Sequence, residues 1–254
     1  MLGATTAIAL LAFAGAPENT DRFTPGVAAS VGVGIGIIHR HGAPFDGVFL
    51  DSFPGAVPAG ELRLAVDGVP KARPTLSIGG DVQWRTSTLN PMEVRVGGVE
   101  PRTVHARTMA GTATLGLTWW PRRLAHRLGI GGEAGYAVAP LWIRDDVALA
   151  PYALHGPLAR GRLEAWSRRG RVQLLARSGI GAMVPTGLEN AHMTRPGPSV
   201  NVALDLVVRI EGPVHLYGHA QLWYAFMSRG SMRRFDDHGV PFIVGLLLRT
   251  PRAG

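Results

Sequence analysis

Hydrophobic and polar residues alternate along much of this chain with a period of two. The clearest segment is 199–211, where every even position from Val200 to Ile210 is valine, leucine or isoleucine. Because neighbouring side chains of a strand point to opposite faces, this pattern predicts a β-strand with one apolar and one polar face. The polar face carries Ser199, Asn201, Asp205, Arg209 and Glu211.

Similar segments recur, bounded by glycine, proline or charged turns, and together they predict ten strands. The predicted strands are 27–38, 60–68, 74–87, 103–120, 126–143, 157–168, 171–184, 198–211, 213–228 and 239–250. Short and long connections alternate between these strands. The long connections are 39–59, 88–102, 144–156, 185–197 and 229–238.

Such alternation of connection lengths is typical of barrels of the bacterial outer membrane. We therefore predict an all-β fold: a closed antiparallel up-and-down transmembrane β-barrel of about ten strands over residues 27–250. Segment 60–68 has the weakest apolar face, because Glu61, Arg63 and Asp67 interrupt it. A barrel of eight strands is the alternative.

The polar faces of the predicted strands indicate which way they point. Small residues dominate these faces, as at Ser30, Gly32, Gly34 and Gly36, and small residues suit a crowded interior. A soluble barrel such as a lipocalin would carry long charged side chains on its wet face instead. Isolated charged and histidine residues would be costly against lipid, so we expect them to pair in the lumen. These residues are Asp81, Arg85, Glu133, Arg160, Arg162, Glu164, Arg177, Asp205, Arg209, His215 and His219.

Aromatic residues gather near the ends of the predicted strands. Tryptophan and tyrosine favour the two membrane interfaces, where the ring is half buried and its polar edge stays hydrated. We therefore predict two aromatic belts. The belt beside the long loops comprises Trp84, Trp142, Tyr224, Phe226 and Phe242, and the belt beside the short turns comprises Trp119, Trp120 and Trp166.

Composition excludes several other classes of protein. Of the 254 residues 46% are hydrophobic and 17% charged, and no apolar stretch is long enough for a transmembrane helix. The absence of cysteine excludes disulfides and thiolate metal sites. The net charge is +8, but the basic residues are scattered, so we expect no nucleic-acid binding. Residues 1–16 have the small-x-small pattern of a cleavable signal peptide, and residues 17–26 form a lead into the barrel.

With these features the segment from Val27 to Thr250 resembles the small outer-membrane β-barrel proteins of Gram-negative bacteria, the OmpA/OmpX-like group in the broad sense. The resemblance lies in the strand pattern and carries over no catalytic residue. It implies an outer-membrane location, with the lipid bilayer and the outer-membrane assembly machinery as partners and lipopolysaccharide as a candidate partner. Members of the group usually end the last strand on an aromatic residue, whereas this chain continues Leu248-Arg249-Thr250.

Candidate catalytic and metal-binding groups are few. His215 and His219 share one strand face but lie roughly 13 Å apart at the usual strand rise, so they cannot bind one ion. We expect them to form hydrogen bonds in the lumen. The segments 39–41 (His-Arg-His) and 233–238 (Arg-Arg-Phe-Asp-Asp-His) are interpreted as solvated loops. Common catalytic signatures are absent, and we expect no catalytic residue, metal or cofactor.

The function that this interpretation favours is that of a non-enzymatic, porin-like outer-membrane barrel. Its lumen would be filled by side chains, and its long external loops would serve a structural or binding role, with a narrow channel as the other possibility. Two alternatives stay open. One is an outer-membrane hydrolase or acyltransferase with a rim site, which a serine or aspartate within about 3 Å of a lumenal or rim histidine would support. The other is a soluble, exported lipocalin-like barrel whose apolar faces turn inward.

Overall fold

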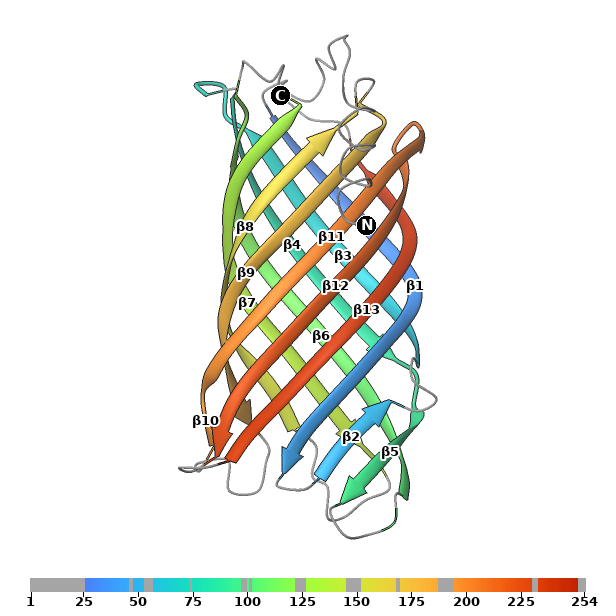
Figure 1. Ribbon diagram of the computed structural model, residues 1–254. Helices are drawn as coiled ribbons and strands as arrows, with labels where there is room; N and C mark the ends of the chain where they lie inside the picture. The colour runs from blue at the N-terminus through green and yellow to red at the C-terminus, as the bar shows by residue number, and fades with distance from the viewer. Residues whose placement is uncertain are drawn as a thin grey trace, which may run out of the picture.

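In the computed structural model the described residues form thirteen strands, and ten of these close into an antiparallel barrel (Figure 1). The structure describes residues 26–250, except 46–47, 53–56, 74, 97–99, 101, 122–126, 145–151, 168–169, 187–193 and 230–232. The predicted signal peptide, residues 1–16, and all but the last residue of the predicted lead lie outside the described residues. Within the described part of the chain, no helix has the length and apolar character needed to cross a bilayer.

Ten long strands follow one another around the ring, each paired with its neighbours in the chain. They are β1 (Gly26–Phe45), β3 (Val57–Val69), β4 (Leu76–Ser87), β6 (Arg102–Trp119), β7 (Leu128–Ile143), β8 (Tyr152–Trp166), β9 (Val172–Thr186), β11 (Gly197–Glu211), β12 (Val214–Arg229) and β13 (Arg233–Arg249).

Three short strands are added at one end, and these are β2 (Val48–Ser52), β5 (Asn90–Val96) and β10 (Thr194–Arg195). We call this the loop end; it is the lower end in Figure 1. The opposite end, where β1 begins and β13 finishes, is the short-turn end.

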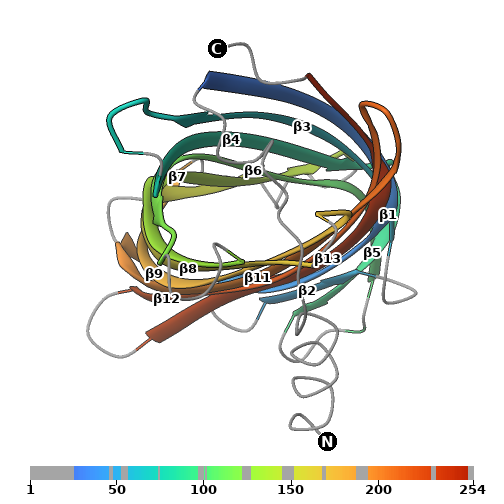
Figure 2. The ribbon, with the colours of Figure 1, turned by 90° about the horizontal axis from the view of Figure 1, so that it is seen from above.

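The first and last barrel strands close the ring. β1 and β13 pair without interruption from Ser30↔Arg249 to Gly42↔Asp237. Viewed along its axis the ring is oval (Figure 2). Because β13 also pairs with β12 along its length, the ring has no free edge at this junction where another strand could add.

The barrel is apolar outside and polar inside. Large aliphatic side chains such as Ile35, Leu115 and Ile180 have 78%, 73% and 70% of their surface exposed on the outer wall. Arg85 and Asp205, in contrast, are each only 1% exposed in the interior. Exposing so many aliphatic side chains to water would be unfavourable, whereas the hydrocarbon of a bilayer matches them. The predicted orientation of the strand faces is therefore confirmed, and the lipocalin-like alternative is wrong.

The strand predictions hold in number and differ in length. Segment 60–68 is a full barrel strand, β3, so the count of ten is confirmed and the alternative of eight is wrong. The predicted loop 229–238 is largely strand, because β12 continues to Arg229 and β13 begins at Arg233. For the same reason Phe242, predicted near a strand end, lies in the middle of β13. The His-Arg-His segment 39–41 likewise belongs to β1.

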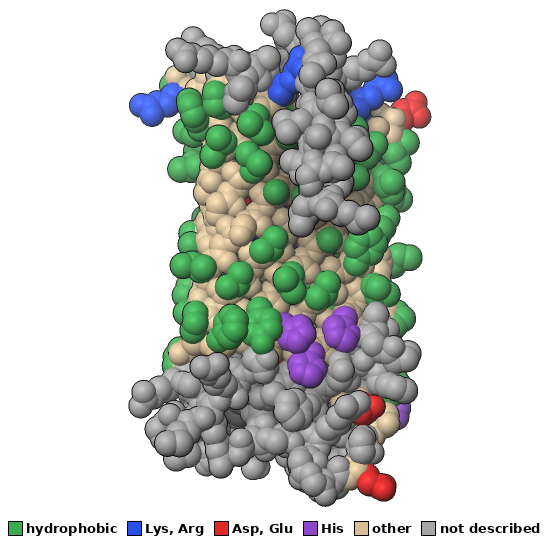
Figure 3. Space-filling view, in the orientation of Figure 1, with side chains coloured by type: hydrophobic (Ala, Val, Ile, Leu, Met, Phe, Trp, Pro, Cys, Tyr) green, Lys and Arg blue, Asp and Glu red, His purple; other side chains and the backbone are tan. Residues whose placement is uncertain are grey.

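Most aromatic residues of the belt predicted beside the long loops lie on the outer wall. Trp84, Trp142 and Phe226 are exposed there and Tyr224 is half-buried. The Tyr224 ring packs on Phe226 with 4.3 Å between ring centroids and stacks on His238 at 5.2 Å. Histidine side chains gather on this face beside hydrophobic ones, close to the loop end (Figure 3).

The belt predicted beside the short turns is only partly correct. Trp119 is exposed on the outer wall, but the adjacent Trp120 is 2% exposed and donates from its indole nitrogen to Ser77 Oγ at 3.1 Å. Trp166 also turns inward and donates to Glu164 at 2.6 Å. The reason is the strand alternation itself, since consecutive residues cannot both face lipid.

Glycines on the inner face of the β1–β13 seam make room for an aromatic ring. Gly34 and Gly245 lie directly opposite each other. A Cβ at Gly34 would stand 2.6 Å from the Tyr217 hydroxyl, and one at Gly245 would stand 2.7 Å from the ring and 2.3 Å from a backbone oxygen. The glycines of β1 and β13 thus leave space for the Tyr217 ring, which is fully buried.

Candidate functional site in the barrel lumen

A connected polar network crosses the lumen, with Arg85 of β4 at its centre. Its guanidinium donates through Nε to Glu61 of β3 and through Nη1 to Gln221 of β12 at 2.6 Å. Nη2 donates to the Gln83 side chain. Glu61 in turn accepts a hydrogen bond from the Tyr217 hydroxyl at 3.0 Å. Because β4 and β12 are not neighbours in the sheet, Arg85 connects two separate parts of the wall.

His219 of β12 links Arg85 to Asp205 of β11. Its Nδ1 lies against Asp205 Oδ1, and its Nε2 lies 2.8 Å from Arg85 Nη2. A carboxylate can only accept and a guanidinium can only donate, so the tautomer that fits carries its proton on Nδ1 and accepts at Nε2. Both ring nitrogens of this buried histidine are therefore used in the network.

Asp205 is a second centre of the network. Its Oδ2 accepts from Arg63 Nη2 at 3.1 Å and from Arg177 Nη2. Arg63 also donates to Asp81 Oδ2, from Nε at 2.9 Å and from Nη2 at 2.6 Å. Charge-assisted contacts of this kind are the strong class of hydrogen bond, and here they join strands β3, β4, β9 and β11.

A neighbouring group of ion pairs lies on β7 and β8. Arg160 Nη2 is 2.5 Å from Glu133 Oε1, and Arg162 Nη2 donates to Glu164 Oε2 at 3.0 Å. Glu164 Oε1 accepts from two further side chains at 2.6 and 2.8 Å, those of Trp166 and Gln173. Both oxygens of Glu164 are thus engaged by donors from three residues.

Near the loop end a second connection crosses the lumen, formed by Arg40 of β1. It donates to Asp237 of β13 from Nε at 3.1 Å and from Nη2 at 2.7 Å. It also donates to the carbonyl oxygens of Pro140 at 2.9 Å and Ala139 at 3.0 Å, on β7. The Arg40 guanidinium carbon lies 5.4 Å from the Trp223 ring centroid, within cation–π range. We call this group the Arg40 brace.

The acceptors on β7 are available because the local ladder is interrupted. Proline has no backbone N–H, and the pairing between β6 and β7 skips Ala139 and Pro140. Their carbonyl groups face a guanidinium that is itself 1% exposed, paired with a fully buried Asp237. The brace therefore satisfies backbone and side-chain groups together in a region closed to water.

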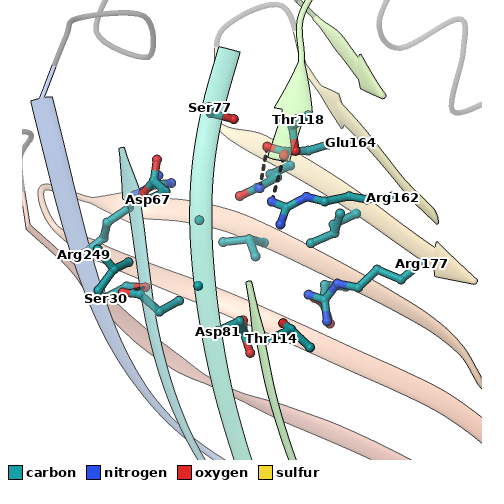
Figure 4. A pocket seen from close by; sticks show the side chains of 18 of the residues that line it. Ser30, Asp67, Ser77, Asp81, Thr114, Thr118, Arg162, Glu164, Arg177 and Arg249 are labelled. Atoms are coloured by element: carbon teal, nitrogen blue, oxygen red, sulfur yellow. Dashed lines mark hydrogen bonds and ion pairs between the residues drawn. The ribbon is translucent and has the colours of Figure 1, made fainter. Parts of the chain in front are cut away.

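Toward the short-turn end the lumen opens into a cavity of about 100 Å³ (Figure 4). Arg162 and Arg177 point into it from one side, and Asp67 and Arg249, which are 2.7 Å apart, line the other. Its further polar lining residues are Ser30, Arg63, Ser77, Asp81, Thr114, Thr118, Glu164, Gln173 and Asp205. We call this space the lumenal vestibule.

Most of the residues that the sequence assigns to the lumen thus meet in one network, but two lie apart. Arg209 is exposed, and its Nε donates to the Gly212 carbonyl oxygen at 3.1 Å. His215 is half-buried, with Nδ1 3.1 Å from the Pro213 carbonyl oxygen. Both residues have the inward parity of their strands, but the strands end within a few residues. They therefore lie at the short-turn rim and not in the packed lumen.

Sequence analysis missed the Arg40 brace and part of the central network. The interpretation of Arg40 and Asp237 as solvated loop residues is wrong, because both are buried and Arg40 continues the inward parity of Gly34 and Gly36. Glu61 and Arg63 were counted against a strand, yet they alternate with leucines as lumenal residues should. Extending the period-two pattern through charged positions would have identified all of them.

Comparison with known proteins rests on structure alone. No family model matches the chain, and no curated protein matches its sequence. The outer membrane protease OmpT from Escherichia coli matches with a TM-score of 0.55 at 10% identity, over 89% of this chain and 98% of that chain. The attachment invasion locus protein Ail of Yersinia pestis matches with a TM-score of 0.37 at 10% identity, over 89% and 99%. The toluene transporter TodX of P. putida matches with a TM-score of 0.39 at 9% identity, over 92% of each chain.

The chain has the fold of a bacterial outer-membrane β-barrel. The exposed aliphatic side chains of the outer wall match the hydrocarbon of a bilayer, in keeping with a place in the bacterial outer membrane. Barrels of this fold generally keep their short turns on the periplasmic side. At this level of identity the likeness extends to the fold and not to the activities of the matched proteins.

The network of the outer-membrane barrel offers one contact that resembles a catalytic dyad. Asp205 lies within hydrogen-bond reach of His219, which meets the distance criterion for a rim or lumenal enzyme site. The other ring nitrogen of His219, Nε2, however, faces Arg85 and Gln221. Among the described residues, no three histidine or acidic side chains stand where they could hold a metal ion.

Proposed function

We propose that this outer-membrane barrel is non-enzymatic, that its lumen is closed to solutes, and that it acts as a structural or binding scaffold through its loop end. The observation that carries the proposal is the pair of connections across the lumen. The Arg40 brace links β1 and β13 to β7, and the Arg85 network links β3 and β4 to β12.

Barrel size supports a closed lumen. An eight-stranded barrel is just filled by its interior side chains, and a barrel of ten strands is only slightly wider. Here that interior holds long arginines whose partners are themselves buried, so opening a passage would separate ion pairs in a region of low dielectric. Opening such a lumen by rotamer changes alone would therefore have a high free-energy cost.

The engagement of both ring nitrogens of His219 supports a non-enzymatic role. General-base catalysis needs a nitrogen that can take a proton from a nucleophile, and His219 Nε2 already faces the Arg85 guanidinium. A scaffold role remains for the loop end, where a rigid barrel holds its connecting segments, and such segments commonly carry function.

Planar lipid bilayer recording of the purified, folded barrel tests the closed lumen. We expect no steady current from the native protein. The combined variant Arg85→Ala/Glu61→Ala/Arg40→Ala/Asp237→Ala removes both connections and should produce discrete conductance steps, whereas Arg209→Ala, at the exposed rim, should stay silent. A steady ohmic current from the native protein would overturn the proposal.

A further inference from the structure

Several buried hydrogen-bond donors of the lumenal vestibule have no hydrogen-bond acceptor. Among the described residues that line it, the buried side-chain atoms without a hydrogen-bond partner are Arg63 Nη1, Arg162 Nε, and Arg177 Nε and Nη1. All of these atoms are donors. The Arg63 and Arg177 side chains are 8% and 2% exposed, so bulk solvent does not reach them freely.

Most carboxylate oxygens near these donors are already engaged, and Glu133 Oε2, at 3.9 Å from Arg177 Nε, is too far for a hydrogen bond. Asp205 already accepts from Arg63, Arg177 and His219, and Asp81 accepts twice from Arg63. The two oxygens of Glu164 are engaged, and Asp67 is paired with Arg249 at 2.7 Å. Buried donors normally find an acceptor, so the complement is to be sought in a molecule that enters the vestibule.

We propose that the lumenal vestibule binds a small oxyanion that enters from the short-turn, periplasmic end. Planar guanidinium groups bind phosphate and carboxylate oxygens through parallel hydrogen bonds, and two such groups, those of Arg162 and Arg177, face the open space (Figure 4). The volume of about 100 Å³ exceeds the roughly 10–15 Å³ that one water needs on the same kind of measure. There is space for an ion of phosphate or acetate size.

Recognition in this site depends on donor geometry more than on net charge. The acidic residues of the vestibule are each held by a basic partner, so the site does not attract anions through a strong surplus of positive charge. A group with several acceptor oxygens, such as phosphate, is therefore favoured over chloride, which has no directional lone pairs to match two guanidinium planes.

Titration of the detergent-folded, full-length barrel with inorganic phosphate by isothermal calorimetry tests the site. The native protein should bind phosphate at a single saturable site, and Arg162→Gln should weaken that binding about tenfold or more, as loss of a charge-assisted hydrogen bond implies. This variant should fold, because Glu133 keeps Arg160 and Glu164 keeps Trp166 and Gln173.

Arg209→Gln is the matched control. It removes the same charge at the same end of the barrel, outside the vestibule, and should bind phosphate as the native protein does. Acetate in place of phosphate distinguishes a carboxylate ligand from a phosphate ligand. Absence of saturable binding of either ion, or equal weakening in Arg162→Gln and Arg209→Gln, would overturn the proposal. The measurement needs no membrane current, so its outcome is independent of whether the lumen conducts.

Discussion

Removing the charge of Asp237 tests whether the Arg40 brace is a dry, buried ion pair. Asp237→Asn keeps the shape of the side chain and takes away one partner of a pair that is 1% and 0% exposed. Loss of one partner of a buried pair costs about 3–5 kcal/mol. Arg40 keeps its acceptors on Ala139 and Pro140, so we expect about 3 kcal/mol, the lower end of that range.

Arg40→Met should cost more, about 5 kcal/mol, because it removes all four hydrogen bonds of the guanidinium and the buried positive charge that faces Asp237. The double variant Arg40→Met/Asp237→Leu leaves no unpaired charge. It should therefore lose far less stability than the two single changes together.

Equilibrium unfolding in guanidinium chloride, followed by tryptophan fluorescence in detergent micelles, measures these free energies. Trp223, which packs under Arg40, reports on the brace directly. If Asp237→Asn lost less than about 1 kcal/mol, the value typical of an exposed pair, the brace would be hydrated and the argument for a closed outer half of the lumen would fail.

Three further expectations follow from the wall and its seam. Gly245→Ala should lower the free energy of unfolding by about 1–3 kcal/mol through overpacking, whereas Gly218→Ala, where no heavy atom lies within 4 Å of the added Cβ, should change it little; thermal unfolding compares them. Ile180→Arg should cost up to about 2–4 kcal/mol in lipid vesicles, and an unchanged stability relative to Ile180→Leu would contradict a lipid-facing wall. Brominated lipids should quench single-tryptophan variants that keep Trp119 and spare those that keep Trp120, and the reverse order would refute their opposite facing.

The period-two pattern predicted the fold because each face of a barrel strand meets the same kind of environment along its whole length. Lipid on one side and a crowded interior on the other impose a strict period of two, which survives even in segment 60–68. What periodicity could not give was the pairing across the lumen. Arg40 and Asp237 are 197 positions apart, and their contact depends on the curvature of the closed ring. The inward turn of Trp120 and Trp166 follows from strand parity, which here outweighs the preference of tryptophan for membrane interfaces.

The position of the Arg40 brace has a consequence for how the protein assembles. Its two charged residues lie on the first and the last strand of the barrel, so they come into contact only when those two strands pair. An assembly intermediate with this seam open would hold an unpaired guanidinium and an unpaired carboxylate at the membrane, an arrangement of high free energy. Half-formed species should therefore be sparsely populated, and completion of the cylinder should be a cooperative step.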